Sequence, residues 1–414
     1  MKKKIAIVGG GASGMTAAIT AAREGAAVTV YEHLRLGKKI LATGNGKCNL
    51  SNWDMKADYY HSTCPERVEG CLARFGTEET VRFFESLGLC VKDKKGYLYP
   101  LAEQAVVVLQ VLEAELKRLG VQVIYSEKVE EIVALEKVRP GRCVLLKTEA
   151  GKCFFDAVIL ACGSKAAPKT GSDGSGYDLA KKLGHKIQPV LPALVQLQCS
   201  DSFCKALAGI RSEAKIHIFD GKQQLFIEQG ELQLTEYGIS GIPVFQLSGL
   251  VNRYLNTNKK ASLIAKIDFL PDLTEKEYAD FVEKRIQSFS DSRSVGDFFN
   301  GMLNQKLMQQ IIKMAGLKAE QAVDKADKAK LQQVFALCRG LEFHISGSKG
   351  YDNAQVCTGG VDLREVTESL ESVYAKNVYF AGELLDVDGR CGGYNLQWAW
   401  TSGSIAGRAA AQEN

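Results

Sequence analysis

Three glycines near the start of the chain have the spacing of a nucleotide-binding turn. Gly9, Gly11 and Gly14 stand in G-x-G-x-x-G order, between the apolar run 5–8 and the Ala-rich stretch 15–23. A strand, a glycine turn and a helix form this unit because Gly9 allows the turn, Gly11 admits a pyrophosphate and Gly14 lets helix and strand pack closely. The helix N-terminus would then offer N–H groups to the phosphates. The residues predicted to face them are Gly9, Gly11, Ala12, Ser13 and Gly14.

An acidic residue follows at the position expected of a ribose ligand. Residues 27–31 read as a second strand, and Glu32 stands at its end, 18 residues after Gly14. A carboxylate there accepts hydrogen bonds from a ribose diol and disfavours a 2′-phosphate. We therefore expect FAD or NAD rather than NADP at this site, and we expect His33 to lie near the adenosine. The glycine turn by itself does not distinguish FAD from NAD.

The loop after this acid, residues 34–52, is rich in glycine and asparagine. These residue types tolerate positive φ, and the loop would run beside the nucleotide toward its reactive end. The residues predicted to contact the cofactor here are Lys39, Gly44, Asn45, Gly46 and Asn49. Cys48 lies in the same loop, but a redox disulfide needs a second cysteine nearby, and the closest in sequence is Cys64. We therefore expect no catalytic disulfide.

A second glycine turn returns from the far end of the chain. Residues 377–383 read as a buried strand and a turn, and the segment 386–400 leads into a final helix. A second helix N-terminus is expected in a flavin site, because one near 393–396 would stabilise the negative charge that develops at the N1–C2=O edge of the flavin on reduction. FAD is therefore favoured over NAD. Glu383 and Asp386 would hold ribityl or phosphate-side hydroxyls. The predicted contacts are Val129, Gly163, Gly382, Glu383, Asp386, Gly393, Tyr394, Asn395 and Leu396.

Size and composition narrow the class of protein. The chain has 414 residues, enough for two or three domains, with 46% hydrophobic and 24% charged residues. The net charge of +4 gives no argument for a nucleic-acid partner. Apolar runs fall short of the roughly 20 residues of a membrane span, so we expect a cytoplasmic protein with no membrane partner. The twelve cysteines form neither C-x-x-C nor zinc spacing, so no metal is predicted. A small-molecule substrate is expected, and the oligomeric state is left open.

The order of patterns predicts an α/β protein with an insertion. The final strand needs a sheet to join, so residues 1–190 and 350–414 are assigned to one discontinuous dinucleotide-binding domain. Strand-like alternation predicts an inserted antiparallel β domain over 191–270 and 339–349. A Met- and Phe-rich stripe at helical spacing predicts a small helical domain over 271–338.

These motifs together resemble those of the BaiN-type flavoproteins, also called HI0933-like flavoproteins, which include aminoacetone oxidase-like enzymes. The matching segments are 5–14, 39–52, 96–100, 160–176, 230–243 and 381–400. The resemblance implies a glutathione-reductase-like FAD-binding Rossmann domain, with an inserted β domain and a helical domain. The stretch 160–183 is also similar to the fumarate-reductase branch of flavoproteins.

The resemblance implies a FAD-dependent oxidoreductase that takes hydride from NADH or NADPH and reduces an organic acceptor. The most specific form of this hypothesis is an ene-reductase whose acceptor is the conjugated C=C of a steroid-like bile acid intermediate. The alternatives are an amine oxidase that produces peroxide and a flavin-bound, RNA-associated binding protein. The catalytic residue is not identified. The candidates for a proton donor are Tyr394, Glu236 and water. Glu236 stands near Thr235, at a place where the family usually has a histidine.

Overall fold

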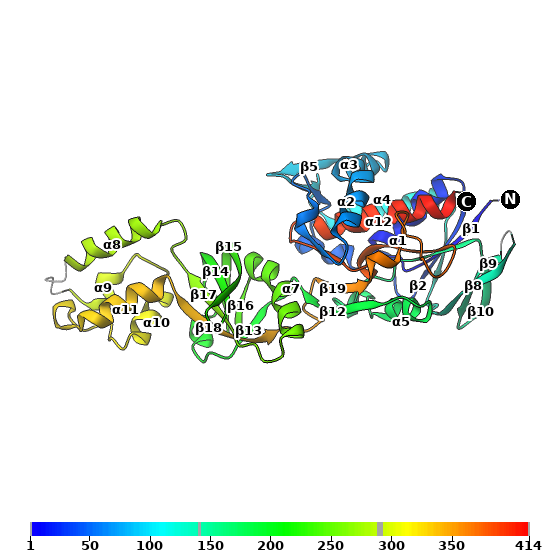
Figure 1. The fold of residues 1–414 in the computed structure, drawn as a ribbon. Helices are drawn as coiled ribbons and strands as arrows, with labels where there is room; N and C mark the ends of the chain where they lie inside the picture. Colours follow the sequence, from blue (N-terminus) through cyan, green and yellow to red (C-terminus); the bar gives the residue numbers. More distant parts are fainter. Residues whose placement is uncertain (1, 140–141, 288–292, 413–414) are drawn as a thin grey trace. The chain divides into compact units, whose positions relative to one another are not determined.

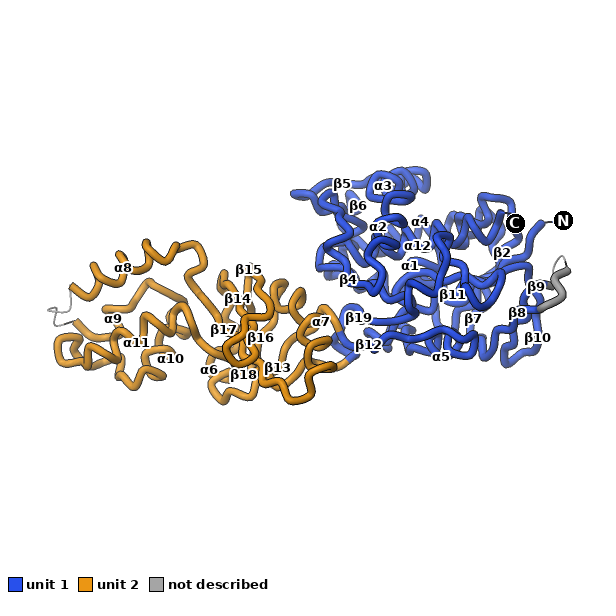
Figure 2. Tube along the Cα trace, in the orientation of Figure 1, with its two compact units in different colours: residues 1–192, 351–414 blue, residues 193–350 orange. Residues whose placement is uncertain are grey.

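The computed structural model (Figure 1) describes residues 2–139, 142–287 and 293–412. The chain forms two compact units, which Figure 2 colours separately. Unit 1 comprises residues 1–192 and 351–414, and unit 2 comprises residues 193–350.

Unit 1 is built on a parallel sheet of five strands in the order β20-β11-β1-β2-β7. The strands are β1 (Lys4–Val8), β2 (Ala27–Glu32), β7 (Gln122–Tyr125), β11 (Ala157–Leu160) and β20 (Val378–Phe380). The prediction that the last strand joins the N-terminal sheet is confirmed, since β20 pairs with β11. Ile5 and Ile7 belong to one apolar cluster, and Ala6 and Val8 to another. Both faces of β1 are therefore covered, which explains its unbroken apolar run.

Two helices from opposite ends of the chain lie side by side in this unit (Figure 1): α1 (Ala12–Arg23) and α12 (Tyr394–Ala411). Their close approach depends on glycine. A Cβ added at Gly403 would lie 2.4 Å from the Ser13 carbonyl oxygen, and one at Gly407 would lie 2.5 Å from that of Ala17. The glycines on α12 therefore bring it against the start of α1, where the glycine turn lies.

Smaller elements complete unit 1. An antiparallel three-stranded sheet has the order β10-β9-β8, a second has the order β3-β6-β5, and β12-β19 and β21-β4 form two-stranded pairs. Their bounds are β3 (Ser51–Asn52), β4 (Tyr60–Ser62), β5 (Val91–Lys94), β6 (Tyr97–Pro100), β8 (Val129–Arg139), β9 (Arg142–Thr148), β10 (Gly151–Phe155), β12 (Ile187–Ala193), β19 (Val356–Val361) and β21 (Val387–Gly389). The remaining helices are α2 (Pro65–Arg74), α3 (Thr77–Ser86), α4 (Ala105–Arg118) and α5 (Ser175–Lys182), with short 3₁₀ turns η1 (Ile40–Gly46), η2 (Ala57–Tyr59), η3 (Pro168–Thr170), η5 (Leu363–Glu365) and η6 (Gly382–Leu384).

Unit 2 contains a closed antiparallel barrel in the order β13-β16-β15-β14-β17-β18. Its strands are β13 (Leu197–Cys199), β14 (Arg211–Asp220), β15 (Gln223–Thr235), β16 (Gly238–Gly241), β17 (Leu263–Asp268) and β18 (Leu341–Ser348). The helices are α6 (Cys204–Leu207), α7 (Ile242–Thr257), α8 (Glu275–Gln287), α9 (Val295–Phe299), α10 (Gln305–Met314) and α11 (Lys328–Cys338), with the turn η4 (Val323–Lys325). One apolar core includes side chains of both the barrel and the helices, such as Ile216 and Phe299. The further split of this unit into a β domain and a helical domain stays a prediction.

One stretch predicted as β structure is helical. Within the range assigned to the inserted β domain, the chain forms α7 over Ile242–Thr257. Gly241 has φ +105, and Pro243 stands in the first turn, where its missing N–H costs nothing. Val244, Leu247 and Val251 are buried at helical spacing, so the period of this stretch is that of a helix.

Candidate cofactor site

The glycine turn between β1 and α1 has the geometry that its spacing predicts. Gly9 has φ +105, and its N–H donates to the Tyr31 carbonyl at 2.9 Å. A Cβ at Gly14 would lie 1.9 Å from the Gly9 carbonyl oxygen, so that position requires glycine. A Cβ at Gly11, by contrast, would meet no described atom within 4 Å. Gly11 borders open space at the start of α1, where no side chain caps the helix, so the turn has room for a phosphate.

Glu32 lies at the end of β2 and faces this turn. Its side chain is buried, and its two carboxylate oxygens accept the N–H groups of Gly10 and Leu34, both at 2.8 Å. A carboxylate has about four lone-pair sites, so these two bonds leave capacity for a ribose diol. His33 has a partly exposed side chain, and a Cβ at Gly171 would lie 3.5 Å from its ring. The second glycine loop therefore lies beside the predicted adenosine end of the site.

Three segments far apart in the sequence meet at the Glu383 carboxylate. Lys39 Nζ lies 3.1 Å from Glu383 Oε2, and the Ser164 hydroxyl donates to the same oxygen at 3.0 Å. Lys39 comes from the loop after β2, Ser164 from the loop after β11, and Glu383 from the turn η6. The structure thus brings together two residues that the sequence predicted separately. Ser164 was not predicted, although it directly follows Gly163.

The loop over residues 39–49 adopts the backbone that its glycines and asparagines suggest. Gly44, Asn45, Gly46 and Cys48 all have positive φ, between +53° and +82°. Residues 44–47 are exposed, whereas Asn49 is buried. Cys48 is fully buried, and burial raises the pKa of its thiol to about 12. It is a free cysteine, and its buried thiol lacks the exposure and the lowered pKa that are typical of a reactive cysteine.

The turn η6 is fixed against the start of α1 by α12. Gly382 has φ +74, and a Cβ there would lie 2.4 Å from the Ser13 hydroxyl. The Gly382 N–H donates to the Ser402 hydroxyl at 2.8 Å, and the Trp398 indole N–H donates to the Gly382 carbonyl at 3.2 Å. Ser402 and Trp398 lie one turn apart on α12, and their hydrogen bonds fix the position of Gly382. The contact of Gly382 with the cofactor stays a prediction. No sequence motif indicated the role of Ser402.

The N-terminus of α12 is shaped by a second set of glycines. Gly393 has φ +97 and precedes the helix without a side-chain cap, and a Cβ there would lie 2.6 Å from the Ser51 carbonyl oxygen. Asn395 holds the preceding turn, because its amide both accepts from the Gly389 N–H and donates to the Gly389 carbonyl, each at 2.8 Å. Leu396 is half-buried beside it. The first turn of α12 therefore offers N–H groups and a positive dipole end to an acceptor.

The two candidate proton donors lie in different units. Tyr394 is buried in unit 1, its hydroxyl donates to the Asp54 carbonyl at 3.0 Å, and burial is the main cause that raises its pKa to about 12. Tyr60 in turn donates to the Tyr394 carbonyl at 2.9 Å. Glu236 is exposed in unit 2, in the turn between β15 and β16. Within unit 1 the Tyr394 phenol thus has a structural partner, and the catalytic role of either residue stays a prediction.

The remaining predicted contacts lie at the edges of the same unit. Asp386 is buried and accepts the Thr63 N–H at 3.0 Å. Val129 begins β8 opposite Thr148. Gly163 has φ +73, and a Cβ there would lie 2.9 Å from the Ser172 hydroxyl, so the loop after β11 passes close to the second glycine loop.

These features fit a flavin dinucleotide. The turn at Gly11 has open space, and a buried carboxylate stands at the predicted ribose position. The helices α1 and α12 both begin without a side-chain cap, and the start of α1 packs against α12 at Gly403. A Rossmann unit extended by a helix from the far end of the chain defines a FAD-dependent oxidoreductase. In the described part of the chain, no group of three or more His, Cys, Asp or Glu side chains is placed to hold a metal ion. No helix there is long and apolar enough to cross a membrane.

Comparison with known proteins places this class more narrowly. The family model "HI0933-like protein Rossmann domain" matches residues 3–409, and the chain belongs to this family. It is 43% identical over 417 residues to a 3-dehydro-bile acid delta(4,6)-reductase of Clostridium scindens, with 99% of both chains covered. It is 29% identical over 401 residues to a ribosomal RNA dihydrouridine synthase of Haemophilus influenzae and 25% identical over 402 residues to one of Escherichia coli. Each of these two alignments covers 96% of this chain and 95% of the relative.

Proposed function

We propose that this protein is a FAD-dependent reductase that takes hydride from NADH or NADPH and saturates a conjugated C=C of a steroid-like enone. The observation that carries this proposal is the 43% identity to a 3-dehydro-bile acid delta(4,6)-reductase over 99% of both chains. Such an end-to-end match includes the cofactor site of unit 1 and all of unit 2. The proposal therefore does not depend on a single motif.

The reaction balances without a metal or a covalent enzyme intermediate. Reduction of a conjugated enone adds a hydride to the β carbon and a proton to the α carbon, and NAD(P)H becomes NAD(P)⁺. When bound, FAD accepts the hydride and passes it on. The proton comes from water or from a side chain, for which Tyr394 and Glu236 remain the predicted candidates.

The residues of the site have distinct supporting roles in this reaction. The N-terminus of α1 and the turn at Gly11 would bind the pyrophosphate, and Glu32 would bind the ribose. Lys39 and Glu383 would orient the segment between phosphate and ring. The N-terminus of α12 would face the edge of the ring where negative charge develops, and a fixed dipole there stabilises that charge without reorganisation.

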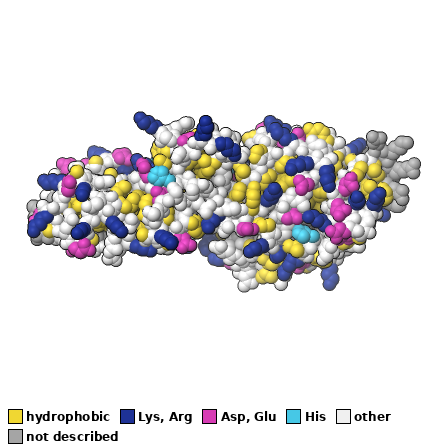
Figure 3. Space-filling view, turned by 90° about the horizontal axis from the view of Figure 1, so that it is seen from below, with side chains coloured by type: hydrophobic (Ala, Val, Ile, Leu, Met, Phe, Trp, Pro, Cys, Tyr) yellow, Lys and Arg dark blue, Asp and Glu magenta, His cyan; other side chains and the backbone are white. Residues whose placement is uncertain are grey.

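A second candidate is reduction of a uracil ring in ribosomal RNA. Two relatives that are aligned over almost the whole chain are named ribosomal RNA dihydrouridine synthases, and this supports it. The lower identity and the net charge of only +4 favour the steroid-like substrate. On the face shown in Figure 3, basic and acidic side chains are interspersed, with no broad basic surface for a phosphate backbone.

Turnover with a substrate panel tests the proposal. Purified holoprotein would be incubated anaerobically with NADH or NADPH and one acceptor, which is either a conjugated bile acid dienone or a ribosomal RNA fragment. In a separate incubation, a primary amine would be tested in air. We expect mass spectrometry to detect the dienone with one C=C reduced, and we expect no peroxide from the amine. Dihydrouridine formation without dienone reduction would support the second candidate instead. Peroxide from the amine without reduction of either acceptor would refute both.

A further inference from the structure

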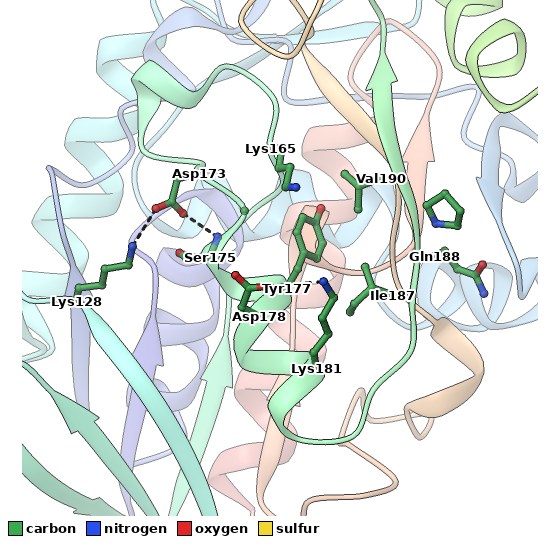
Figure 4. A pocket seen from close by; sticks show the side chains of 12 residues that line it. Lys128, Lys165, Asp173, Ser175, Tyr177, Asp178, Lys181, Ile187, Gln188 and Val190 are labelled. Carbon is green, nitrogen blue, oxygen red and sulfur yellow. Dashed lines mark hydrogen bonds and ion pairs between the residues drawn. The ribbon is translucent and has the colours of Figure 1, made fainter. Parts of the chain in front are cut away.

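A cavity of about 540 Å³ opens in unit 1 between α5 and β12, apart from the predicted FAD contacts (Figure 4). Its volume lies in the range of small-molecule sites. The helix side of the cavity begins at Gly174 and Ser175, and the strand side is formed by Ile187 and Val190. The cavity therefore has a polar end and an apolar wall, which suits a ligand that combines a charged group with a flat ring.

The charged side chains around this cavity carry a net charge of +1. Three lysines and two aspartates line it: Lys128, Lys165, Lys181, Asp173 and Asp178. Lys128 lies 3.3 Å from Asp173, and Lys181 lies 3.7 Å from Asp178. These ion pairs are exposed and therefore weak, so an incoming anion can compete for both lysines. Lys165 makes no ion pair with any residue that the structure describes, so one positive charge is in excess.

The position of Lys165 depends on a glycine. Gly174 has φ +80, and a Cβ there would lie 2.5 Å from Lys165 Cγ and 2.7 Å from its Cε. The aliphatic part of Lys165 thus lies along the backbone at Gly174, where a larger residue would displace it. Figure 4 shows the Lys165 and Lys181 side chains converging on the cavity from opposite sides of the Tyr177 ring. Two ammonium groups therefore flank a single aromatic surface.

That aromatic surface also separates the cavity from the predicted FAD site. The Tyr177 ring is buried, and its hydroxyl donates to the Glu383 carbonyl at 3.4 Å. The carboxylate of the same Glu383 is the one that meets Lys39 and Ser164. One side chain and one turn thus lie between the two sites, so a ligand in the cavity would lie close to the bound cofactor.

We propose that this cavity binds the phosphorylated adenosine end of NADPH. The inference rests on the proposed function, which requires a reduced nicotinamide nucleotide. The Rossmann site is assigned to FAD, and Glu32 disfavours a 2′-phosphate there. Lys165 and Lys181 supply cations for phosphate groups, and the half-buried side chains of Ile187 and Val190 supply an apolar wall for adenine. The cavity is accordingly selective for NADPH over NADH.

Binding of a redox-inert probe tests this site without hydride transfer. The dissociation constant of adenosine 2′,5′-bisphosphate would be measured calorimetrically on the FAD-loaded protein and on its Lys165→Glu variant. Loss of a charge-assisted contact predicts an increase of about tenfold or more in Lys165→Glu. Lys182→Glu is the matched control, because Lys182 lies on α5, the helix that borders the cavity, but does not line it and donates to the Glu130 carbonyl. Its dissociation constant should stay near that of the unmodified protein.

The outcomes separate this site from the proposed reductase. The nucleotide site would be overturned if Lys165→Glu left the dissociation constant of the bisphosphate unchanged, or if Lys182→Glu raised that constant equally. It would also be overturned if inorganic phosphate bound as tightly as the bisphosphate. Bleaching of the flavin by NADPH together with any of these results would leave the reductase standing. Bisphosphate binding that depends on Lys165, in a protein whose flavin neither NADPH nor NADH bleaches, would support the site and refute the reductase.

Discussion

Alanine at Gly11 is expected to separate folding from cofactor binding. Gly11 has φ −77 and ψ −169, a conformation open to alanine, and an added Cβ meets no described atom within 4 Å. The substitution should therefore leave the apoprotein folded and stabilise it by about 0.5 kcal/mol, because alanine loses less conformational entropy on folding. The methyl group would instead occupy the space where a pyrophosphate approaches. Losing one charge-assisted hydrogen bond raises the dissociation constant of FAD roughly 10- to 100-fold.

Gly14→Ala is the contrasting variant in the same turn. Its Cβ would lie 1.9 Å from the Gly9 carbonyl oxygen, so strand and helix must separate. Overpacking against backbone is expected to lower the free energy of unfolding by about 3 kcal/mol or more. Urea denaturation of the apoproteins gives the free energy of unfolding of each variant and of the wild type. Fluorescence titration with FAD gives the three dissociation constants. Wild-type affinity for FAD in Gly11→Ala would refute the assignment of this space to the pyrophosphate, and so would a Gly14→Ala apoprotein as stable as the wild type.

Three further substitutions test other contacts of unit 1. Glu383→Gln removes the charge that faces Lys39 and should weaken FAD binding by about 1 kcal/mol, measured by the same titration. Hydrogen bonds from Arg118 and Arg23 hold the pKa of Glu115 at about 2, below its ordinary 4.5. The ionised carboxylate therefore stabilises the folded protein fully above pH 4.5, and this contribution is lost as the pH falls toward 2. Glu115→Gln should flatten the stability profile in that window; an unchanged profile contradicts this. Tyr394→Phe should cost about 1 kcal/mol of stability, because the hydrogen bond to the Asp54 carbonyl is lost. A hundredfold loss of kcat in this variant would identify Tyr394 as the proton donor, and a kcat within about twofold of the wild type would exclude it.

The parts of the fold that the sequence predicts are those fixed by local rules. The spacing of Gly9, Gly11 and Gly14 predicts the turn because each position meets a steric demand of the backbone. The positive φ of Asn45 and its neighbours follows from residue type. The strand at 378–380 is predicted because an apolar run followed by a glycine needs a sheet, and the sheet is the one that includes β1.

Other features depend on contacts that no local pattern contains. Ser164 meets Glu383 across 219 residues of sequence, and Tyr394 meets Asp54 across 340. Only the folded chain shows that these polar groups have each other as partners. The helix α7 was assigned to a β domain because the alternation of the preceding strands was extended past Gly241, where the period changes. The cavity beside Lys165 likewise arises from two elements brought together by the fold.

Reoxidation of the reduced protein by an enone tests the central claim most directly. The FAD-loaded protein would be reduced anaerobically with one equivalent of NADPH and then mixed with a conjugated bile acid dienone in a stopped-flow spectrometer. We predict that NADPH bleaches the flavin absorption band and that the dienone restores it, with one C=C reduced per flavin. A flavin that NADPH and NADH both fail to bleach, or that only oxygen reoxidises, would contradict the account.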